Sequence, residues 1–297
     1  MKKEILRSLL FIFEKLPLSV LMRTLECLAN VYWMLDAKHR KIAKINLDIA
    51  FPEMERGKKS RIIRRTYKNM ARTVAEIIKI GNLDDKYLRG HVRFEGLDNI
   101  LDPHEKGTGV FAVTAHYGNW ELMASTFGKY FANIDVIVRP QRESFINTYL
   151  NEKRELFGNN VIIKFDSARE IMKRIGGGRI IGVLMDQDTH LNRGKFVDFF
   201  GLPACTLDAI PRIAYATGAK MVPVFPIRDP ANKYRHTVRF LPALNPVVED
   251  RDEFVRLSLE RINRTFEEVI GNDPEHWLWF HRRWRTRPVG DEAIYDI

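Results

Sequence analysis

The stretch GVFAVTAHYGNWELMASTF, residues 109–127, decides the fold class, because it places a strand, a bend and a helix in direct succession. Its first seven residues form an apolar run that is typical of a short buried strand. Gly118 and Asn119 then permit a bend, and Asn119 can cap a helix that begins near Trp120. The pattern predicts that His116 lies at the carboxyl end of a strand, where open α/β sheets bind their ligands.

Similar runs recur on both sides of this stretch. Further strands are predicted at 134–139, 161–164, 179–185, 221–227 and 236–241. Helices are predicted at 58–80, 119–131, 143–157, 167–175, 206–217 and 252–271, and the glycines at 176–178 indicate a helix-to-strand turn. Strands that alternate with helices of this length predict an α/β fold with a central sheet flanked by helices.

Residues 1–35 are strongly apolar but repeatedly interrupted by charge. No uncharged run reaches the ~20 residues that a membrane-crossing helix needs, and Glu14 and Lys15 break the apolar core that a signal peptide requires. The segment therefore predicts one or two helices that lie in the membrane interface, with the basic residues near its start facing anionic headgroups. The alternative is an ordinary helical hairpin packed on the core.

The composition limits the partners. The formal net charge is +10, which favours phosphates, an anionic bilayer or an acidic protein as partners. The two cysteines, Cys27 and Cys205, belong to no metal-type cluster and indicate a reducing compartment rather than a disulfide framework. No phosphate-binding glycine loop and no nucleophile elbow occurs, and Cys205 has no nearby base that would activate it.

His116 and Glu121 suggest acid–base chemistry. If His116 precedes the helix and Glu121 lies in its first turn, the carboxylate can orient the imidazole while the other ring nitrogen takes a proton from an alcohol. The attacking oxygen then belongs to the substrate. A histidine with a purely structural role is the alternative, because the spacing alone is weak.

Several motifs together resemble a known family. HYGNWE at 116–121 resembles the H-x4-D/E motif of glycerolipid acyltransferases, in the form carried by the bacterial lipid A late acyltransferases. Matching segments follow in the family's order: NLDIAFPE at 46–53, VRP at 138–140, GVLMDQD at 182–188, FVDFFGLPACT at 196–206 and WLWFHRRWRTRP at 277–288. The resemblance covers nearly the whole chain.

The resemblance implies a reaction and a place for it. It implies a mixed central sheet, an N-terminal membrane-associating segment at 1–57 and an acyltransferase catalytic domain at 58–297. It implies transfer of a fatty-acyl chain from an acyl thioester, with acyl carrier protein as the carrier, to a hydroxyl of a lipid A precursor. The enzyme would work at the cytoplasmic face of the inner membrane as a peripheral or monotopic protein, without a metal or organic cofactor.

The same resemblance places Arg139 in the active-site motif, beside His116 and Glu121. A guanidinium at a strand end can stabilise a thioester oxyanion or clamp a phosphate, and Arg142 lies close enough in sequence to assist. Asp186, Gln187 and Asp188 also follow a predicted strand. The resemblance assigns these three to binding of the glycolipid substrate, although a D-x-D triplet could instead hold a metal in a glycosyltransferase.

Three further segments complete the predicted substrate site. Phe199 is expected to line an apolar pocket for the fatty chain. Asn119, in the turn after His116, and Thr206 are also expected to contact the substrate, and Thr206 is expected to cap the helix at 206–217 as well. Arg282 and Arg283 lie in an aromatic and basic tail that suits an anionic lipid or single-stranded nucleic acid. Without a recognised nucleic-acid fold, the lipid is favoured. Other acceptors, such as a lysophospholipid, and a non-enzymatic lipid tether remain alternatives.

Overall fold

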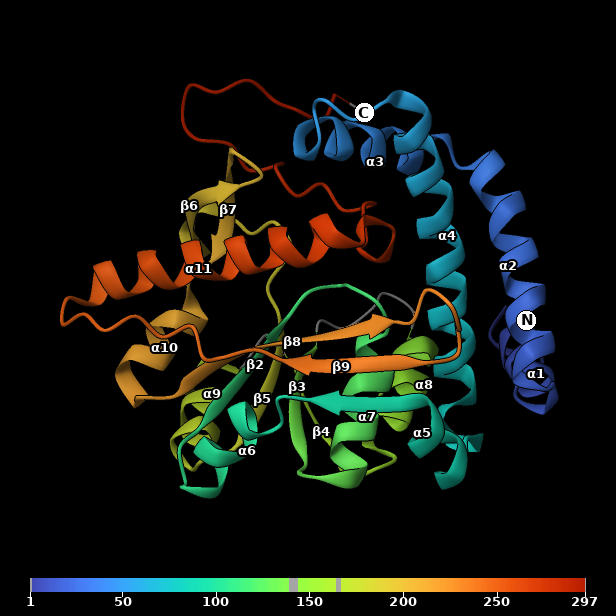
Figure 1. Cartoon of the computed structure of the whole chain (residues 1–297), viewed down its shortest axis with the longest axis horizontal. Coiled ribbons are helices and arrows are strands. Elements are labelled where there is room, and N and C mark those ends of the chain that lie inside the picture. The colour runs from blue at the N-terminus through green and yellow to red at the C-terminus, as the bar shows by residue number, and fades with distance from the viewer. Residues whose placement is uncertain (1, 139–143, 164–166, 297) are drawn as a thin grey trace.

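The computed structural model describes residues 2–138, 144–163 and 167–296. Its centre is a seven-stranded sheet with the order β1-β9-β8-β2-β5-β3-β4 (Figure 1). The strands are β1 (Val92–Glu95), β2 (Val110–Thr114), β3 (Ile134–Val138), β4 (Asn160–Ile163), β5 (Ile180–Leu184), β8 (Lys220–Arg228) and β9 (His236–Phe240). Within this described sheet, β8 and β9 pair in antiparallel fashion and the other neighbouring strands are parallel. The sheet is therefore mixed, which confirms the predicted fold class.

Helices cover both faces of this sheet because its central strands are apolar on both sides. Successive side chains of a strand point to opposite faces. Phe111 and Val113 of β2 accordingly join one core cluster, whereas Val110 and Ala112 join the other. The first cluster includes residues of α9 (Ser167–Gly176), α10 (Ala209–Thr217) and α11 (Arg251–Asn272), and the second includes residues of α5 (Asp85–His91), α6 (Asp98–Glu105) and α7 (Trp120–Tyr130). The remaining helix of this region is α8 (Ser144–Glu155).

A separate hairpin corrects one sequence prediction. Strands β6 (Gly194–Phe199) and β7 (Leu202–Leu207) pair in antiparallel fashion, and Thr206 faces Lys195 in that register. Thr206 is therefore a strand residue, and helix α10 begins only at Ala209. The expected capping role of Thr206 is wrong because the backbone there is committed to the hairpin ladder. The described residues also contain short 3-10 turns: η1 (Ile80–Asn82), η3 (Leu191–Arg193) and η4 (Pro274–His276).

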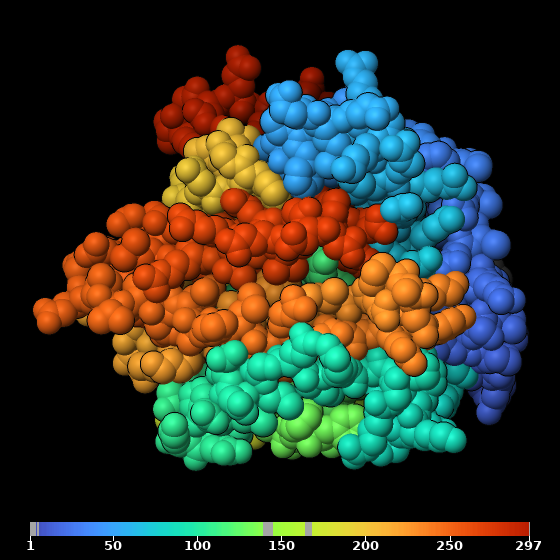
Figure 2. Space-filling model, viewed as in Figure 1, coloured from blue at the N-terminus to red at the C-terminus, as the bar shows by residue number. Residues whose placement is uncertain are grey.

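The N-terminal helices pack along the side of the sheet domain. They are α1 (Lys2–Lys15), α2 (Leu18–Leu35), α3 (Ala37–Ala50) and the long α4 (Arg56–Lys79). Leu21 and Met22 of α2 form a small core with Ala75 and Ile78 of α4. Figure 2 shows α3, the β6–β7 hairpin and the C-terminal segment gathered at one end of the molecule. The amide of Asn46 in α3 donates to the carbonyls of Trp279 and His281, so α3 is tied directly to that segment.

The outer face of the N-terminal helices is apolar and exposed. Large hydrophobic side chains that water reaches include Phe11 and Ile12 on α1 and Val31, Met34 and Leu35 on α2. Among the helices that the structure describes, none combines the length and apolarity needed to cross a bilayer. Membrane association of residues 1–57 stays a prediction.

Candidate active site

His116 meets Asp186 at the carboxyl edge of the sheet. His116 follows β2 and Asp186 follows β5, and these strands are parallel neighbours, so the residues just beyond them come together. The imidazole Nδ1 lies 2.8 Å from Asp186 Oδ1, and the His116 backbone N–H donates to Oδ2 at 3.0 Å. A backbone bond from Met185 to the carbonyl of Thr114 extends the ladder up to this point. The carboxylate thus fixes both the backbone and the ring of His116.

The environment of Asp186 keeps this carboxylate charged. Asp186 is 2% exposed, and the indole Nε1 of Trp277 donates to its Oδ2 at 2.8 Å. Burial alone would raise the pKa of Asp186, but the charge of His116 and these hydrogen bonds lower it to about 2. Burial has the opposite effect on the imidazole and lowers the pKa of His116. The negative charge of Asp186 outweighs that effect, so the pKa of His116 is raised overall. The pair therefore stabilises the protonated imidazole.

The other ring nitrogen is available for chemistry. A carboxylate accepts hydrogen bonds only, so Nδ1 of neutral His116 is the protonated nitrogen and Nε2 has the free lone pair. No hydrogen bond to Nε2 is found within residues 2–138, 144–163 and 167–296. The His116 side chain is 19% exposed. This arrangement allows a substrate hydroxyl to give its proton to Nε2.

The turn after His116 is held from three sides. Gly118 has a φ of +58°, and a Cβ atom there would collide with the carbonyl oxygen of Pro226, so only glycine fits. The hydroxyl of Thr73 on α4 donates to the Gly118 carbonyl at 3.1 Å. On the other side, Gly118 N–H donates to the His276 carbonyl, and Leu278 N–H donates to the His116 carbonyl. The C-terminal segment is therefore part of the frame that positions the imidazole.

Asn119 confirms one sequence prediction and corrects another. Its side-chain oxygen accepts from Leu122 N–H at 3.0 Å, which is the expected cap of α7. Its amide donates to Glu76 of α4, and the residue is fully buried. Because every polar atom of this side chain serves the protein frame, Asn119 is a structural residue rather than a contact of the substrate.

Glu76 is the centre of a buried network below the turn. Its carboxylate pairs with Arg228 at 2.7 Å and with His236 at 3.0 Å, in addition to Asn119. Arg228 comes from β8 and His236 from β9, and all four side chains are almost completely inaccessible to water. Burial alone would raise the pKa of Glu76, but the charges of Arg228 and His236 lower it. The network anchors helix α4 to the sheet and to the start of α7.

Glu121 is not the carboxylate that binds the imidazole. Both of its oxygens accept hydrogen bonds from Arg154 on α8, and the distance from Arg154 Nε to Glu121 Oε2 is 2.9 Å. The orienting partner of His116 is instead Asp186, because the capped start of α7 directs Glu121 toward α8. The negative charge of Glu121 still contributes to the raised pKa of His116. The expected direct pairing of His116 with Glu121 is therefore corrected.

The remaining predicted residues lie in different surroundings. Arg139 and Arg142 lie outside the described residues. Gln187 Nε2 is 3.4 Å from His116 Nδ1 and thus belongs to the site, whereas Asp188 accepts hydrogen bonds from the backbone and hydroxyl of Thr286. Arg282 is partly buried. The two aspartates of the D-x-D triplet therefore face different protein donors, which is not the arrangement of a shared metal site.

Two predicted substrate contacts are core residues in this structure. Phe199 is fully buried and its ring packs against Trp277 and Trp284. Arg283 is also fully buried, and it donates to the Cys205 carbonyl at 2.9 Å and to the hydroxyl of Thr206. The guanidinium of Arg283 lies over the Phe199 ring. Arg283 thus ties the tail to the β6–β7 hairpin, and its expected contact with an anionic substrate is replaced by a structural role.

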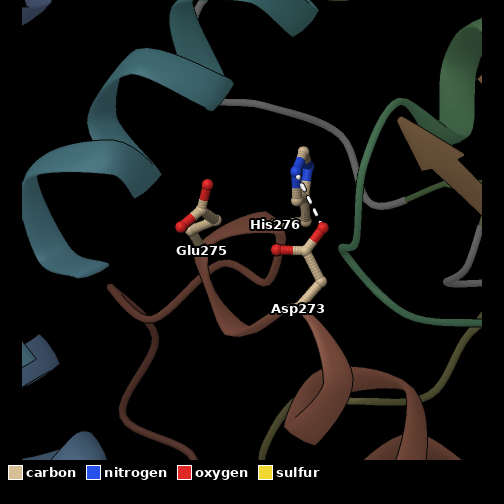
Figure 3. Close-up of side chains that lie close together, drawn as sticks. All are labelled: Asp273, Glu275 and His276. Carbon is tan, nitrogen blue, oxygen red and sulfur yellow. Dashed lines mark ion pairs between the residues drawn. The ribbon is translucent and has the colours of Figure 1, made fainter. Parts of the chain in front are cut away.

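One cluster of candidate metal ligands lies behind the catalytic turn. Asp273, Glu275 and His276 offer ligand atoms within 4.8 Å of one another (Figure 3). His276 Nε2 lies 3.3 Å from Asp273, and Glu275 pairs with Arg65. Burial and the neighbouring charge of Glu275 raise the pKa of Asp273 to about 6. Asp273 and His276 thus pair with each other, Glu275 pairs with Arg65, and the His276 carbonyl accepts from Gly118 N–H, so the segment that carries the cluster also holds the turn at Gly118.

The structure adds residues that the sequence reasoning missed. Trp277 lies in the aromatic and basic tail, Arg154 lies in the predicted helix at 143–157, and Thr73 and Glu76 lie in the helix at 58–80, which its apolar spacing predicts. Buried polar residues inside an amphipathic helix, such as Glu76, are the one signal that could have indicated such a network. The partners themselves follow from strand order, which the sequence does not reveal.

The comparisons with known proteins identify the family of this chain. A family model described as bacterial lipid A biosynthesis acyltransferase matches residues 5–286. The lipid A biosynthesis lauroyltransferase of Escherichia coli K12 is 24% identical over 97% of this chain and 92% of its own length. The lipid A biosynthesis myristoyltransferase of the same strain is 24% identical over 88% of this chain and 80% of its own length. The lipid A biosynthesis palmitoleoyltransferase of E. coli K12 is 23% identical over 87% of this chain and 82% of its own length.

The family model spans nearly the whole described structure, including the turn at His116, the residues after β5 and the segment around Trp277. The expected resemblance is confirmed. The chain belongs to the bacterial lipid A biosynthesis acyltransferase family and is an acyltransferase.

Proposed function

We propose that this enzyme transfers a fatty-acyl chain from an acyl thioester on acyl carrier protein to a hydroxyl of a lipid A precursor, at the cytoplasmic face of the inner membrane. The observation that carries the proposal is the His116–Asp186 pair at the carboxyl edge of the sheet. An imidazole whose Nδ1 is fixed by a buried carboxylate and whose Nε2 is unoccupied is built to remove a proton from an alcohol.

The proposed reaction runs through one tetrahedral intermediate. Nε2 of His116 takes the proton of the acceptor hydroxyl as its oxygen attacks the thioester carbonyl. The C–S bond then breaks, the ester forms, and the protonated imidazole returns its proton to the departing thiolate. Asp186 stabilises the imidazolium between these two steps, which agrees with the raised pKa of His116.

Glu121 and Arg139 complete the proposal. Glu121, held by Arg154, adds a second negative charge near the imidazole and so favours the protonated intermediate. Arg139 remains the proposed stabiliser of the thioester oxyanion or of a phosphate on the acceptor. Neither role requires a metal or an organic cofactor.

Two features support the acidic carrier and the membrane as partners. The net charge of +10 attracts both acyl carrier protein and anionic lipids. The exposed apolar side chains of α1 and α2 form a face suited to the membrane interface. We propose that this face lies in the headgroup region while the sheet domain stays in water.

A mass-spectrometric transfer assay tests the proposal. Purified protein is offered mixed acyl carrier protein thioesters together with a lipid A precursor and a lysophospholipid, and the added acyl mass is read on each acceptor. Acyl gain on the lipid A precursor is the expected result. Transfer to the lysophospholipid alone would overturn the proposed acceptor, and transfer from acyl coenzyme A but not from acyl carrier protein would overturn the proposed donor.

A further inference from the structure

A cationic cavity lies between the end of α2 and the facing sides of α3 and α4. Its volume is about 340 Å³, which falls in the usual range of small-ligand sites. Asp48 is the one acidic residue in its lining. The basic residues that line it are Arg40, Lys44, Arg56 and Lys59. Trp33 and Ile63 supply apolar walls. The cavity is therefore shaped and charged for an anion that carries an apolar portion.

The positive charge in this cavity is only partly neutralised. Asp48 accepts from Lys59 at 2.9 Å and from Lys44 at 2.6 Å, so one carboxylate serves two lysines. Arg40 is held by the carbonyls of Trp33 and Met34, which are neutral. For the exposed side chain of Arg56, no ion pair is found among the residues that the structure describes. A phosphate would supply the missing negative charge.

The cavity borders an exposed apolar face. Residues spaced three or four apart on one side of α2 are each more than half exposed: Leu28, Val31, Met34 and Leu35. This face and the cavity meet in the last turn of α2, because the cationic Arg40 binds the carbonyl of Met34 itself. Trp33 lies beneath the guanidinium groups of Arg40 and Arg64, and tryptophan is favoured where apolar and polar layers meet.

The cavity is well separated from the catalytic turn. Lys59 lines the cavity, whereas Thr73 on the same helix contacts Gly118. Lys59 and Thr73 are fourteen positions apart, or about 21 Å along α4, and Ile63, the cavity residue of α4 nearest to Thr73, is ten positions away, or about 15 Å. A ligand in the cavity would therefore fix the position of α4 without occupying the site of acyl transfer.

We propose that this cavity binds the phosphate of an anionic membrane lipid whose acyl chains lie along the exposed face of α2. The inference rests on the proposed membrane docking and extends it to a defined headgroup site. The bound lipid sets the height of the enzyme on the bilayer and, through α4, the orientation of the catalytic turn toward the membrane.

Vesicle sedimentation with the full chain tests this site. The probes are vesicles of phosphatidylcholine alone and vesicles that also contain phosphatidic acid. The double variant Lys44→Gln with Arg56→Gln is compared with the double variant Arg89→Gln with Arg256→Gln. The control pair removes the same charge from exposed positions on α5 and α11. Thermal unfolding of each variant confirms that it is folded.

The cavity variant is expected to lose affinity for phosphatidic acid vesicles by about tenfold or more, and the control pair by about twofold. Equal losses in the two pairs would mean a diffuse electrostatic attraction and would overturn the site. Weaker binding of inorganic phosphate in the cavity variant, with vesicle binding unchanged, would make it a site for free phosphate and overturn the lipid. Selective loss of acyl carrier protein binding would reassign the cavity to that partner.

The wild-type protein separates this inference from the proposed function. If it binds neither type of vesicle, the proposed membrane docking fails together with the headgroup site. If it binds vesicles but the cavity variant matches the control, only the headgroup site fails. Selective vesicle binding without acyl transfer in a parallel assay would support the headgroup site and overturn the proposed reaction.

Discussion

Asp186 Oδ1 lies 2.8 Å from the Nδ1 atom of His116, although the two residues are 70 positions apart in the chain. The contact exists because β2 and β5 are parallel neighbours whose carboxyl ends meet. It gives the imidazole a defined tautomer and a stabilised protonated form.

The pH dependence of acyl transfer should report the raised pKa of His116. A general base acts in its neutral form, so kcat/KM should rise with pH through a midpoint above the ordinary value of 6.5. Asp186→Asn removes the negative charge that raises this pKa, so the midpoint should move to lower pH and the plateau rate should fall by about 10²- to 10⁴-fold. An unchanged midpoint in Asp186→Asn would contradict the assigned partnership.

Glu121 and Arg154 should behave as one unit. Removal of either charge leaves the other partly buried and unpaired, so Glu121→Gln and Arg154→Gln should each lower kcat/KM. A double-mutant cycle on kcat/KM should give a coupling of about 1 kcal/mol or more. The exposed pair of Arg256 and Glu260 provides the control, for which the same cycle on kcat/KM should give a value near zero. Additive effects at Glu121 and Arg154 would show that their contact carries no function.

Glu76→Gln should destabilise the fold. The substitution leaves Arg228 buried without its charge partner, which typically costs about 3–5 kcal/mol. Thermal and urea unfolding should show this loss, whereas Glu260→Gln at an exposed pair should change stability by less than about 1 kcal/mol. A similar stability for both variants would mean that the buried network does not anchor α4 to the sheet.

Asp273→Asn should stabilise the protein in a pH-dependent way. The pKa of Asp273 is raised from 3.8 to about 6, so folding favours its protonated form. Stability from this group is present at low pH and is lost as the pH rises through about 6. Asparagine cannot ionise, so the variant should gain about 1 kcal/mol near pH 7.5, after allowance for solvent screening at this partly exposed site. The gain should vanish near pH 4, and a gain that is independent of pH would contradict this account.

Much of the fold could be predicted from the sequence, because the signals are local. The apolar run before His116 and the capping residue Asn119 predicted β2 and α7 nearly to the residue. The prediction that Thr206 caps a helix was wrong. Its hydroxyl is typical of a helix cap, but Thr206 pairs with Lys195 on the neighbouring strand and is therefore a strand residue. Helices α5 and α6 and strand β1 went unpredicted, since their short segments carry little periodicity.

The site was only partly predictable for a related reason. Sequence placed both His116 and Asp186 at strand ends, but strand order decides that β2 and β5 are neighbours, and that order is a property of the whole sheet. Glu121 was the nearer carboxylate in sequence, yet the cap of α7 directs it toward Arg154. Trp277 and Glu76 reach the site from remote elements, and no local pattern marks their partners.

The most direct test of the central claim is acyl transfer by His116→Ala, measured by mass spectrometry on a lipid A precursor with acyl carrier protein thioesters. His104→Ala is the matched control, because His104 is also partly buried but bonds the Gly178 carbonyl away from the catalytic turn. Both variants are first shown to unfold cooperatively. Loss of at least about 10²-fold in His116→Ala, with near wild-type transfer in His104→Ala, is the predicted result. Normal turnover by folded His116→Ala would contradict the account.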